Sequence, residues 1–331
     1  MRINFLAFVI FACTVDRTFG ATYQRTSQLT GQSFLNAFHF DAIPDPTNGR
    51  VTYVDESTAI SDGLVSVDNN QLTLRADYTT QLAPSDPGRN SFRIVSNAQY
   101  STHVAIFDIA HMPQGCGTWP AEVGANWPYE GEVDIVEGVN DEPPNACTLH
   151  TGSNCQMPAS RSMTGLEPIV ESRAFGADTI EFSTATGNNC DAYATGNAGC
   201  GVKINDNKSY GPEFNDNGGG WYAIERSPTY IKIFFWERTS GSVPSDITSP
   251  GSSIDTNTWG TPAAYFPDTD CDFPSHFGPH NIVINLTFCG DWAGSVYPWS
   301  GCPSTCVDYV NDNPSAFDNA YFEFNSLNIY Q

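Results

Sequence analysis

Short runs in which apolar and polar residues alternate recur along the whole chain, and clusters of Gly, Pro, Asn and Asp separate them. Alternation with a period of two, in runs rich in β-branched and aromatic residues, predicts half-buried β-strands. The predicted strands are residues 71–78, 91–94, 104–109, 132–137, 146–151, 220–226, 230–238, 281–289 and 321–330. In the last of these, the alternation predicts that Phe322 and Phe324 lie on the face opposite to Tyr321 and Leu327.

Helical periodicity is weak throughout the chain. Only residues 306–311 suggest a short helical turn, and we find no internal repeat, charge block or linker of biased composition. Many short strands joined by turns are typical of an antiparallel β-sandwich. The pattern therefore predicts an all-β protein, with one large β domain or two small ones after residue 20.

The N-terminus has the features of a secretory signal peptide. Arg2 precedes an apolar run over residues 5–15, and small residues at 20–21 provide a suitable cleavage point. The run is too short to span a membrane, and no hydrophobic tail for a lipid anchor ends the chain. Lipid attachment at Cys13 is the weaker alternative, because this cysteine lies inside the apolar run. We therefore expect residues 1–20 to be removed and the rest to be secreted into the extracellular medium.

The chain is strongly acidic, with 37 Asp and Glu residues against 14 Lys and Arg, and its formal net charge is −23. Loss of residues 1–20 removes two arginines and one aspartate, which changes the charge to −24. Such a charge repels nucleic acids and anionic membranes, so neither is expected as a partner. It suits a neutral polysaccharide, although acidic charge is also a general route to solubility.

Nine cysteines remain after residue 20, and in a secreted chain they indicate disulfides with one thiol left over. They are Cys116, Cys147, Cys155, Cys190, Cys200, Cys271, Cys289, Cys302 and Cys306. Cys147 occupies a position where an apolar residue is expected, so it is the candidate for the unpaired thiol. A zinc site made by the last four cysteines is the alternative, but their spacing is not that of a zinc finger.

The most informative segment is residues 131–138, Gly-Glu-Val-Asp-Ile-Val-Glu-Gly. It sets Glu132, Asp134 and Glu137 among strand-forming Val and Ile residues, where stability alone does not explain three neighbouring acids. In a regular strand Glu132 and Asp134 share a face and Glu137 points away. One extra residue between Asp134 and Glu137, a β-bulge, would return Glu137 to that face. The two glutamates would then lie roughly 5 Å apart, which is the separation that retaining glycosidases use.

Asp134 would influence both glutamates in such an arrangement. Its charge and hydrogen bonds would shift their pKa values and help one glutamate to stay protonated. The alternative is a solvated, acidic edge strand with no catalytic role.

Residues 131–138 resemble the bulged E-x-D-x-x-E signature of glycoside hydrolase family 16. The resemblance covers nearly all of residues 21–331 and points to fungal laminarinase-type endo-β-1,3(4)-glucanases, so it implies one catalytic domain over that range. Its further blocks are residues 115–121 (G-C-G-T-W-P-A), 148–151 (T-L-H-T), 218–226, 234–238 and 285–294 (N-L-T-F-C-G-D-W-A-G).

The resemblance implies a β-jelly-roll sandwich of two curved antiparallel sheets, with a substrate cleft across the concave one. It also implies that Glu132 is the nucleophile, that Glu137 is the general acid/base, and that Asp134 assists the nucleophile. The substrate-binding residues that it implies are His150 on the neighbouring strand, Arg93, the sugar-stacking Trp127 and Trp292, and Trp119 beside the site.

The function implied by the resemblance is that of a secreted, retaining endo-β-glucanase. Its substrates would be β-1,3-glucans, with mixed β-1,3/1,4-glucans as a second class. The mechanism requires no cofactor, although relatives carry a structural calcium on the convex face, and we expect a monomer. A non-catalytic β-glucan-binding protein and a cell-wall glucan transglycosylase are the alternatives on the same fold.

The binding residues also have purely structural interpretations. A buried histidine such as His150 is usually a hydrogen-bonded structural residue, and Arg93 could pair with one of the many acids. Aromatic side chains more often fill cores than bind ligands, which applies above all to Trp221 and Trp236 inside predicted strands. Trp127 is a stronger candidate, because its loop leads directly into the acidic strand.

The sequence also departs from the family pattern in two places. The second Trp of a W-P-A-x-W block is missing after Ala121, and about twenty residues around 166–183 are extra. An errant gene model or a real loop at one end of the cleft would explain the extra segment. Asn207 and Asn285 lie in N-glycosylation sequons. We expect Asn207 to be accessible in a loop, whereas Asn285 falls inside a predicted strand.

Overall fold

The computed structural model describes residues 21–121, 127–166 and 187–331. The proposed signal peptide and almost all of the extra segment around 166–183 lie outside these residues. Within them, no helix is long and apolar enough to cross a membrane.

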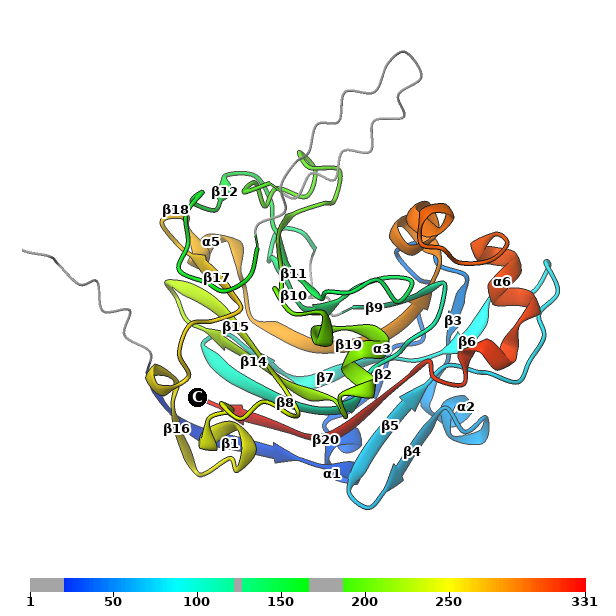
Figure 1. Ribbon diagram of the computed structural model, residues 1–331, viewed down its shortest axis with the longest axis horizontal. Coiled ribbons are helices and arrows are strands. Elements are labelled where there is room, and N and C mark those ends of the chain that lie inside the picture. The colour runs from blue at the N-terminus through cyan, green and yellow to red at the C-terminus, as the bar shows by residue number, and fades with distance from the viewer. Residues whose placement is uncertain (1–20, 122–126, 167–186) are drawn as a thin grey trace, which may run out of the picture.

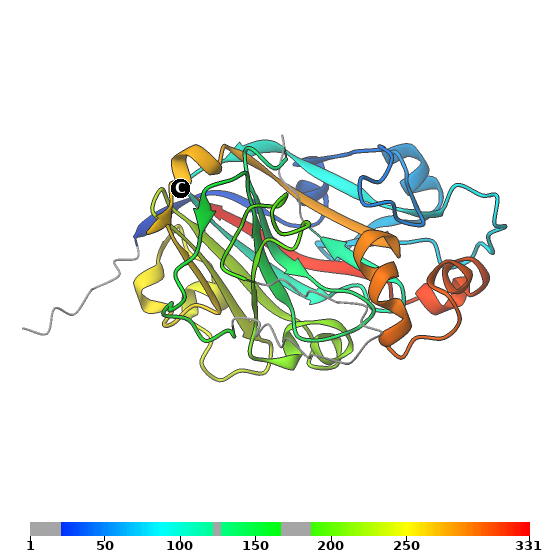
Figure 2. The same ribbon diagram turned by 90° about the horizontal axis from the view of Figure 1, so that it is seen from above.

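Two stacked antiparallel sheets form the body of the protein (Figures 1 and 2). The outer sheet contains, in spatial order, β16 (Ser253–Asp255), β1 (Thr22–Leu29), β20 (Tyr321–Tyr330), β8 (His103–His111), β14 (Gly220–Arg226), β15 (Tyr230–Glu237) and β17 (Ala264–Pro267), with β5 (Gln71–Arg75) and β4 (Val65–Asp68) continuing from β20. The inner sheet contains β2 (Phe38–Phe40), β7 (Arg93–Tyr100), β19 (His280–Phe288) and β9 (Thr118–Ala121), and then β10 (Glu132–Glu137), β11 (Ala146–His150) and β13 (Cys200–Lys203) beside β9. This arrangement confirms the expected all-β jelly-roll class.

Shorter elements lie around the two sheets. Two small pairs stand outside them: β3 (Val51–Tyr53) with β6 (Arg89–Ser91), which is parallel, and β12 (Cys155–Gln156) with β18 (Asp270–Cys271). The helices are α1 (Gly31–Asn36), α2 (Glu56–Ser61), α3 (Gly211–Asp216), α4 (Ser245–Thr248), α5 (Phe273–His276) and α6 (Cys306–Asp312). Shorter helical turns are η1 (Asn207–Ser209), η2 (Thr256–Thr258), η3 (Gly290–Gly294), η4 (Tyr297–Trp299) and η5 (Pro314–Phe317). The short helix expected near residues 306–311 is α6.

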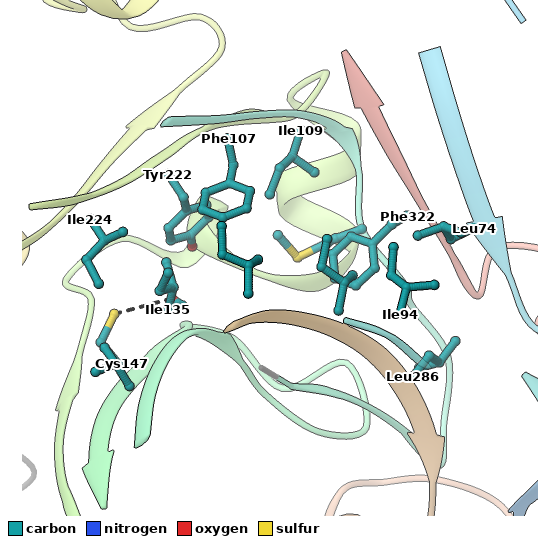
Figure 3. Close-up of a cluster of buried hydrophobic side chains, with 14 of the residues drawn as sticks. Leu74, Ile94, Phe107, Ile109, Ile135, Cys147, Tyr222, Ile224, Leu286 and Phe322 are labelled. Atoms are coloured by element: carbon teal, nitrogen blue, oxygen red, sulfur yellow. Dashed lines mark hydrogen bonds between the residues drawn. The ribbon is translucent and has the colours of Figure 1, made fainter. Parts of the chain in front are cut away.

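The main core fills the space between the two sheets (Figure 3). Alternate residues of each strand point into it, as period-two alternation requires. The outer sheet contributes Phe107, Ile109, Tyr222 and Ile224, and the inner sheet contributes Ile94, Ile135, Cys147 and Leu286. The strands of the inner sheet therefore present their other residues on the face turned away from the core, which we call the open face.

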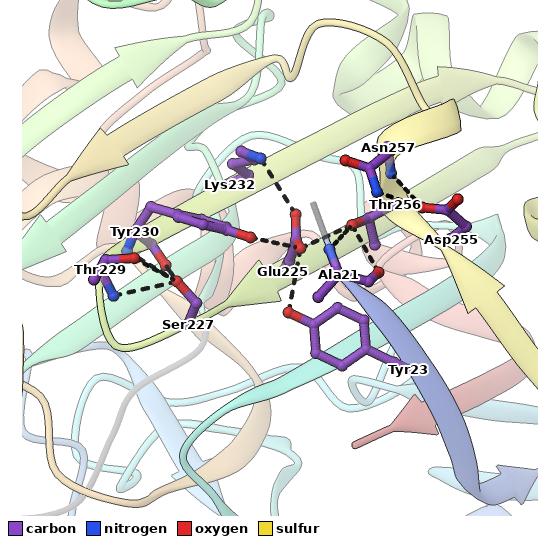
Figure 4. Close-up of polar contacts among 10 residues, drawn as sticks. All are labelled: Ala21, Tyr23, Glu225, Ser227, Thr229, Tyr230, Lys232, Asp255, Thr256 and Asn257. Carbon is purple, nitrogen blue, oxygen red and sulfur yellow. Dashed lines mark hydrogen bonds and ion pairs between the residues drawn. The ribbon is translucent and has the colours of Figure 1, made fainter. Parts of the chain in front are cut away.

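A second cluster covers the far side of the outer sheet, and Trp221 and Trp236 belong to it, as the structural interpretation expected. Next to it, the fully buried Glu225 accepts hydrogen bonds from Tyr230 Oη at 2.9 Å and Thr256 Oγ1 at 2.8 Å (Figure 4). Its other oxygen lies 3.5 Å from the ammonium group of Lys232. The acid is therefore neutralised by an ion pair and hydrogen bonds, as a buried charge requires.

The predicted sidedness of β20 is wrong at its C-terminal half. Phe322 and Phe324 enter the main core as expected, but Leu327 is also fully buried in it. The pairing of β20 with β8 shifts register between Phe324 and Ser326. This irregularity inverts the alternation, because an extra residue moves the following side chains to the other face.

Four disulfides join Cys116 to Cys302, Cys155 to Cys271, Cys190 to Cys200, and Cys289 to Cys306. The zinc alternative is wrong, because all four of its cysteines are paired in these bonds. Cys147 is the free cysteine of the described residues, and it lies fully buried in the core, as predicted.

Candidate active site

The acidic strand β10 contains the predicted β-bulge. Opposite it on β11, Glu132 pairs with His150, Asp134 with Thr148, and Glu137 with Ala146. Three steps along β10 therefore correspond to two steps along β11, so β10 carries one extra residue between Asp134 and Glu137. The extra residue returns Glu137 to the open face that already holds Glu132 and Asp134.

One side chain, Asn145, bridges two backbone groups of the bulge, one of which also accepts a weak hydrogen bond of 3.5 Å from Cys147 Sγ. Asn145 Oδ1 accepts a hydrogen bond of 2.8 Å from the Glu137 N–H, and its Nδ2 donates one of 2.9 Å to the Ile135 carbonyl. Asn145 is fully buried, and its own N–H donates to Ser209 Oγ at 3.0 Å. The sequence analysis missed this residue. The available signal was weak: a polar residue directly before a strand, following two prolines.

The three acids are buried, so the alternative of a solvated edge strand is wrong. Their exposed fractions are 8% for Glu132, 1% for Asp134 and 9% for Glu137. Burial raises the pKa of Glu132 well above its usual value, and the negative charges of Asp134 and Glu137 raise it further. Burial also raises the pKa of Glu137. The cluster therefore resists full ionisation, because neighbouring anions away from water are unfavourable.

Three neighbours counteract this effect by stabilising the ionised carboxylates. The neighbouring Trp127 side chain lowers the pKa of Glu132, and a hydrogen bond of 3.2 Å from Trp119 Nε1 lowers that of Glu137. His150 contributes in the same direction for both glutamates, and its Nε2 lies 3.3 Å from Asp134 Oδ2. His150 is thus a buried neighbour of Asp134 on the adjoining strand, and its role toward substrate stays a prediction.

The aromatic pair beside Glu137 consists of Trp119 and Trp292. The two rings meet edge to face, with centroids 5.8 Å apart. Asn140 connects the segments that carry them: its Oδ1 accepts from Gly117 N–H at 2.8 Å, and its Nδ2 donates to the Ala293 carbonyl at 2.9 Å. The structure therefore places Trp119 next to Glu137, and Trp292 next to Trp119.

Arg93 extends the open face toward β7. It lies directly opposite Asn285 of β19, while Thr287 of β19 lies opposite Trp119 of β9. Residues that face each other across antiparallel strands share one face of the sheet, so these four side chains line the open face together. Arg93 Nε also donates to Asp41 Oδ2 at 3.0 Å, so the expected ion pair is present as well.

A polar network that the sequence analysis did not identify continues from Arg93. Asn285 Nδ2 donates to Tyr53 Oη at 3.0 Å, and Tyr53 Oη donates to Asp45 Oδ1 at 3.3 Å. Thr287 Oγ1 donates to the other Asp45 oxygen at 2.9 Å. Asn285 is buried at 4% exposure, so this sequon is inaccessible as expected, whereas Asn207 is exposed at the start of η1.

No metal site is evident in the described ranges, where no three His, Cys, Asp or Glu side chains are grouped to hold an ion. On the outer face, the Glu225 carboxylate is already paired with Lys232. The structural calcium that the resemblance suggested stays a prediction, and the chemistry below uses no metal.

Comparison with known proteins agrees with this geometry. Residues 38–330 match the family model described as "XgeA-like, catalytic GH16 domain". The chain is 43% identical over 322 residues to a "Probable endo-1,3(4)-beta-glucanase" of Aspergillus clavatus, an alignment that covers 94% of this chain and 46% of that protein. It is 39% identical over 323 residues to the endo-1,3(4)-beta-glucanase xgeA of Emericella nidulans, covering 94% and 48%. The chain thus spans about half the length of these two relatives.

Two solved structures resemble the whole described fold. Laminarinase 16A from Phanerochaete chrysosporium, described with two β-glucans in its donor and acceptor sites, is 54% identical with a TM-score of 0.87, covering 94% of this chain and 100% of that one. An "elongating GH family 16 beta-1,3-glucosyltransferase" is 39% identical with a TM-score of 0.82, covering 93% and 100%.

Proposed function

Because this chain belongs to glycoside hydrolase family 16, we propose that it is a retaining endo-β-glucanase acting on β-1,3-glucans, with mixed β-1,3/1,4-glucans as a second substrate class. The observation that carries the proposal is the bulge of β10, which sets two buried glutamates on one face of the inner sheet. Retaining hydrolysis needs two such carboxyl groups about 5 Å apart. The relatives that are named endo-1,3(4)-beta-glucanases and the laminarinase structure support the choice of substrate.

In the first step, Glu137 donates its proton to the glycosidic oxygen while a Glu132 oxygen attacks the anomeric carbon. The bond to the leaving sugar breaks, and a covalent glycosyl-enzyme forms on Glu132. In the second step Glu137, now ionised, removes a proton from water, whose oxygen attacks the same carbon and releases Glu132. The anomeric configuration is inverted twice and therefore retained.

The surroundings of the two glutamates suit these roles. Burial keeps a proton on the acidic cluster, as the raised pKa values indicate. The neighbouring Trp127 and His150 side chains lower the pKa of Glu132 and so favour the ionised form that it needs for attack. Arg93, Trp119 and Trp292 lie along the same face, and we propose that they contact the sugar chain.

The roles are tested with Glu132→Ala and Glu137→Ala variants and an activated aryl β-glucoside. We expect both variants to lose laminarin hydrolysis, by about 10²- to 10⁴-fold for the acid/base variant. Azide should rescue both, giving a β-glycosyl azide from Glu137→Ala and an α-glycosyl azide from Glu132→Ala. Near-normal laminarin hydrolysis by either folded variant would refute the assignment.

Transglycosylation is the second candidate function, and the similarity to an elongating glucosyltransferase favours testing it. Incubation of laminari-oligosaccharides at high concentration, followed by mass analysis, separates the two outcomes. Transfer products that exceed the release of new reducing ends identify a transferase, and release of reducing ends that exceeds transfer identifies a hydrolase. A non-catalytic β-glucan-binding role is less well supported, because both glutamates are present and face the same side.

We also propose that the protein is exported, acts as a monomer and needs no cofactor or nucleic acid. Four disulfides fit an oxidising compartment, and the net charge disfavours nucleic acid. N-terminal sequencing of protein from the culture medium tests cleavage near residue 20. Activity after treatment with a chelator tests the absence of a metal requirement.

A further inference from the structure

Three exposed aromatic side chains gather beside the acids, and we call Trp127, Tyr129 and Tyr193 the aromatic shelf. Their exposed fractions are 39%, 66% and 63%. The ring of Tyr193 lies next to both others, with centroids 6.1 Å from Trp127 and 6.3 Å from Tyr129. Adjoining exposed aromatic rings are unfavourable in water, and such patches mark binding sites.

The loop that carries Tyr193 is held firmly in place. The Cys190–Cys200 disulfide closes it, and the Asp191 carboxylate accepts the Tyr193 N–H at 3.0 Å. Backbone hydrogen bonds join Thr151 N–H to the Cys190 carbonyl at 2.9 Å and Ala192 N–H to the Thr151 carbonyl at 3.0 Å. Since Thr151 directly follows His150, the loop is attached at the catalytic end of β11. A ring presented on a fixed loop loses little entropy on binding.

The shelf is also connected to the reacting carboxylates. The Trp127 side chain lies near enough to Glu132 to lower the pKa of its carboxyl group, and Tyr129 precedes Glu132 by only three residues. The Tyr129 ring rests on Gly152, where an added Cβ would meet a ring carbon at 3.4 Å. The three rings therefore form one surface that begins at Glu132.

We propose that Tyr129 and Tyr193 extend the sugar-binding surface of Trp127 and hold a glucosyl residue of the substrate next to the one attacked by Glu132. This inference rests on the proposed function, because it takes the ligand to be a β-glucan. A β-linked glucosyl ring has equatorial hydroxyl groups and apolar C–H faces, which stack on aromatic rings, while the phenol groups offer hydrogen bonds at its edge.

The test measures binding of laminari-oligosaccharides by calorimetry in a Glu137→Gln background, which leaves the contact between Trp127 and Glu132 intact. Tyr193→Ala and Tyr129→Ala should each raise the Kd by about 3- to 10-fold, and Tyr193→Phe should retain most of the affinity because the ring remains. Tyr78→Ala is the matched control. Tyr78 is also partly exposed, at 37%, but it packs under Arg75 after β5 in the outer sheet.

The outcomes separate the shelf from the proposed function. Unchanged Kd values in both alanine variants, or changes no larger than that of Tyr78→Ala, would overturn the shelf while leaving the glucanase assignment intact. A parent protein that binds no β-glucan, together with a wild type that hydrolyses none, would overturn both. Melting temperatures of the variants within a few degrees of the parent show that a loss of binding does not reflect unfolding.

Discussion

Replacing Asn145 by alanine should damage the catalytic machinery without touching any acid. The substitution removes the acceptor of the Glu137 N–H and the amide donor to the Ile135 carbonyl, which keeps only the weak Cys147 Sγ–H donor at 3.5 Å; Asn145 itself is fully buried. Each buried backbone group left without a partner costs about 1–3 kcal/mol. The two groups together predict a loss of about 2–5 kcal/mol in the free energy of unfolding, because the weak thiol donor and water entering the vacated space recover part of the penalty.

The catalytic effect should fall mainly on general acid catalysis. Without Asn145, the backbone of Glu137 can leave the geometry that aims its carboxyl group at the glycosidic oxygen. Laminarin has a poor leaving group that needs this proton, whereas a dinitrophenyl glucoside does not. We therefore expect kcat/KM to fall by at least 10-fold more for laminarin than for the activated substrate.

The chain contains a matched control in Asn215. Its side chain bridges backbone groups in the same way, accepting from Met112 N–H at 2.9 Å and donating to the Met112 carbonyl at 3.0 Å, but it lies on α3 and holds the segment after β8. Asn215→Ala should lower stability in urea unfolding while leaving the ratio of the two kcat/KM values unchanged. If Asn145→Ala also leaves that ratio unchanged, the positioning of Glu137 by Asn145 is refuted.

Two further predictions concern pH. Trp119 donates a hydrogen bond that lowers the pKa of Glu137, so Trp119→Phe should raise that pKa and move the basic limb of the kcat/KM profile to higher pH; a limb that stays in place would contradict this role. Burial lowers the pKa of His280 to about 4, below the unfolded value of about 6.5, so its neutral form contributes stability above pH 6.5 that is lost as the pH falls through 4. His280→Gln should therefore show a smaller drop in Tm between pH 7 and pH 4 than the wild type. An equal or larger drop would contradict the contribution of His280 to this pH dependence.

Sequence alone predicted the strands with strong alternation of apolar and polar residues, and it also predicted the acidic strand β10. Residues 132–137, 220–226 and 321–330 coincide with β10, β14 and β20. The bulge in β10 was predictable from the spacing of its three acids, which is two residues and then three. A regular strand would turn Glu137 to the opposite face, so a shared catalytic face requires one extra residue. The bulge in β20 was not, because apolar residues fit the core on either side of the break and leave no such signal. Strand β1, which lies between β16 and β20, was missed for a related reason: its sequence Thr22–Leu29 is mostly polar.

The supporting contacts of the site were beyond sequence reasoning. The role of Asn145 depends on the Glu137 N–H and the Ile135 carbonyl. These two groups come within reach of its side chain only once β10 and β11 have paired and the bulge has formed. The network of Asn285, Tyr53 and Asp45 joins residues more than 200 positions apart. Disulfide connectivity was equally open, because the spacing of nine cysteines permits many pairings.

The Cys190–Cys200 bond has a consequence for anyone who produces this protein in a bacterial host. It closes a loop with a sequence separation of only 10 that carries Tyr193, while β10 and its acids are held by strand pairing and Asn145. Material made in a reducing cytoplasm would lack this bond and the three other disulfides, so strand pairing and Asn145 alone would keep its glutamates in register, and hydrogen bonds alone would hold that tyrosine. Such a preparation would still cleave small chromogenic glucosides. An activity screen based on these substrates would therefore not detect its lower affinity for the polysaccharide.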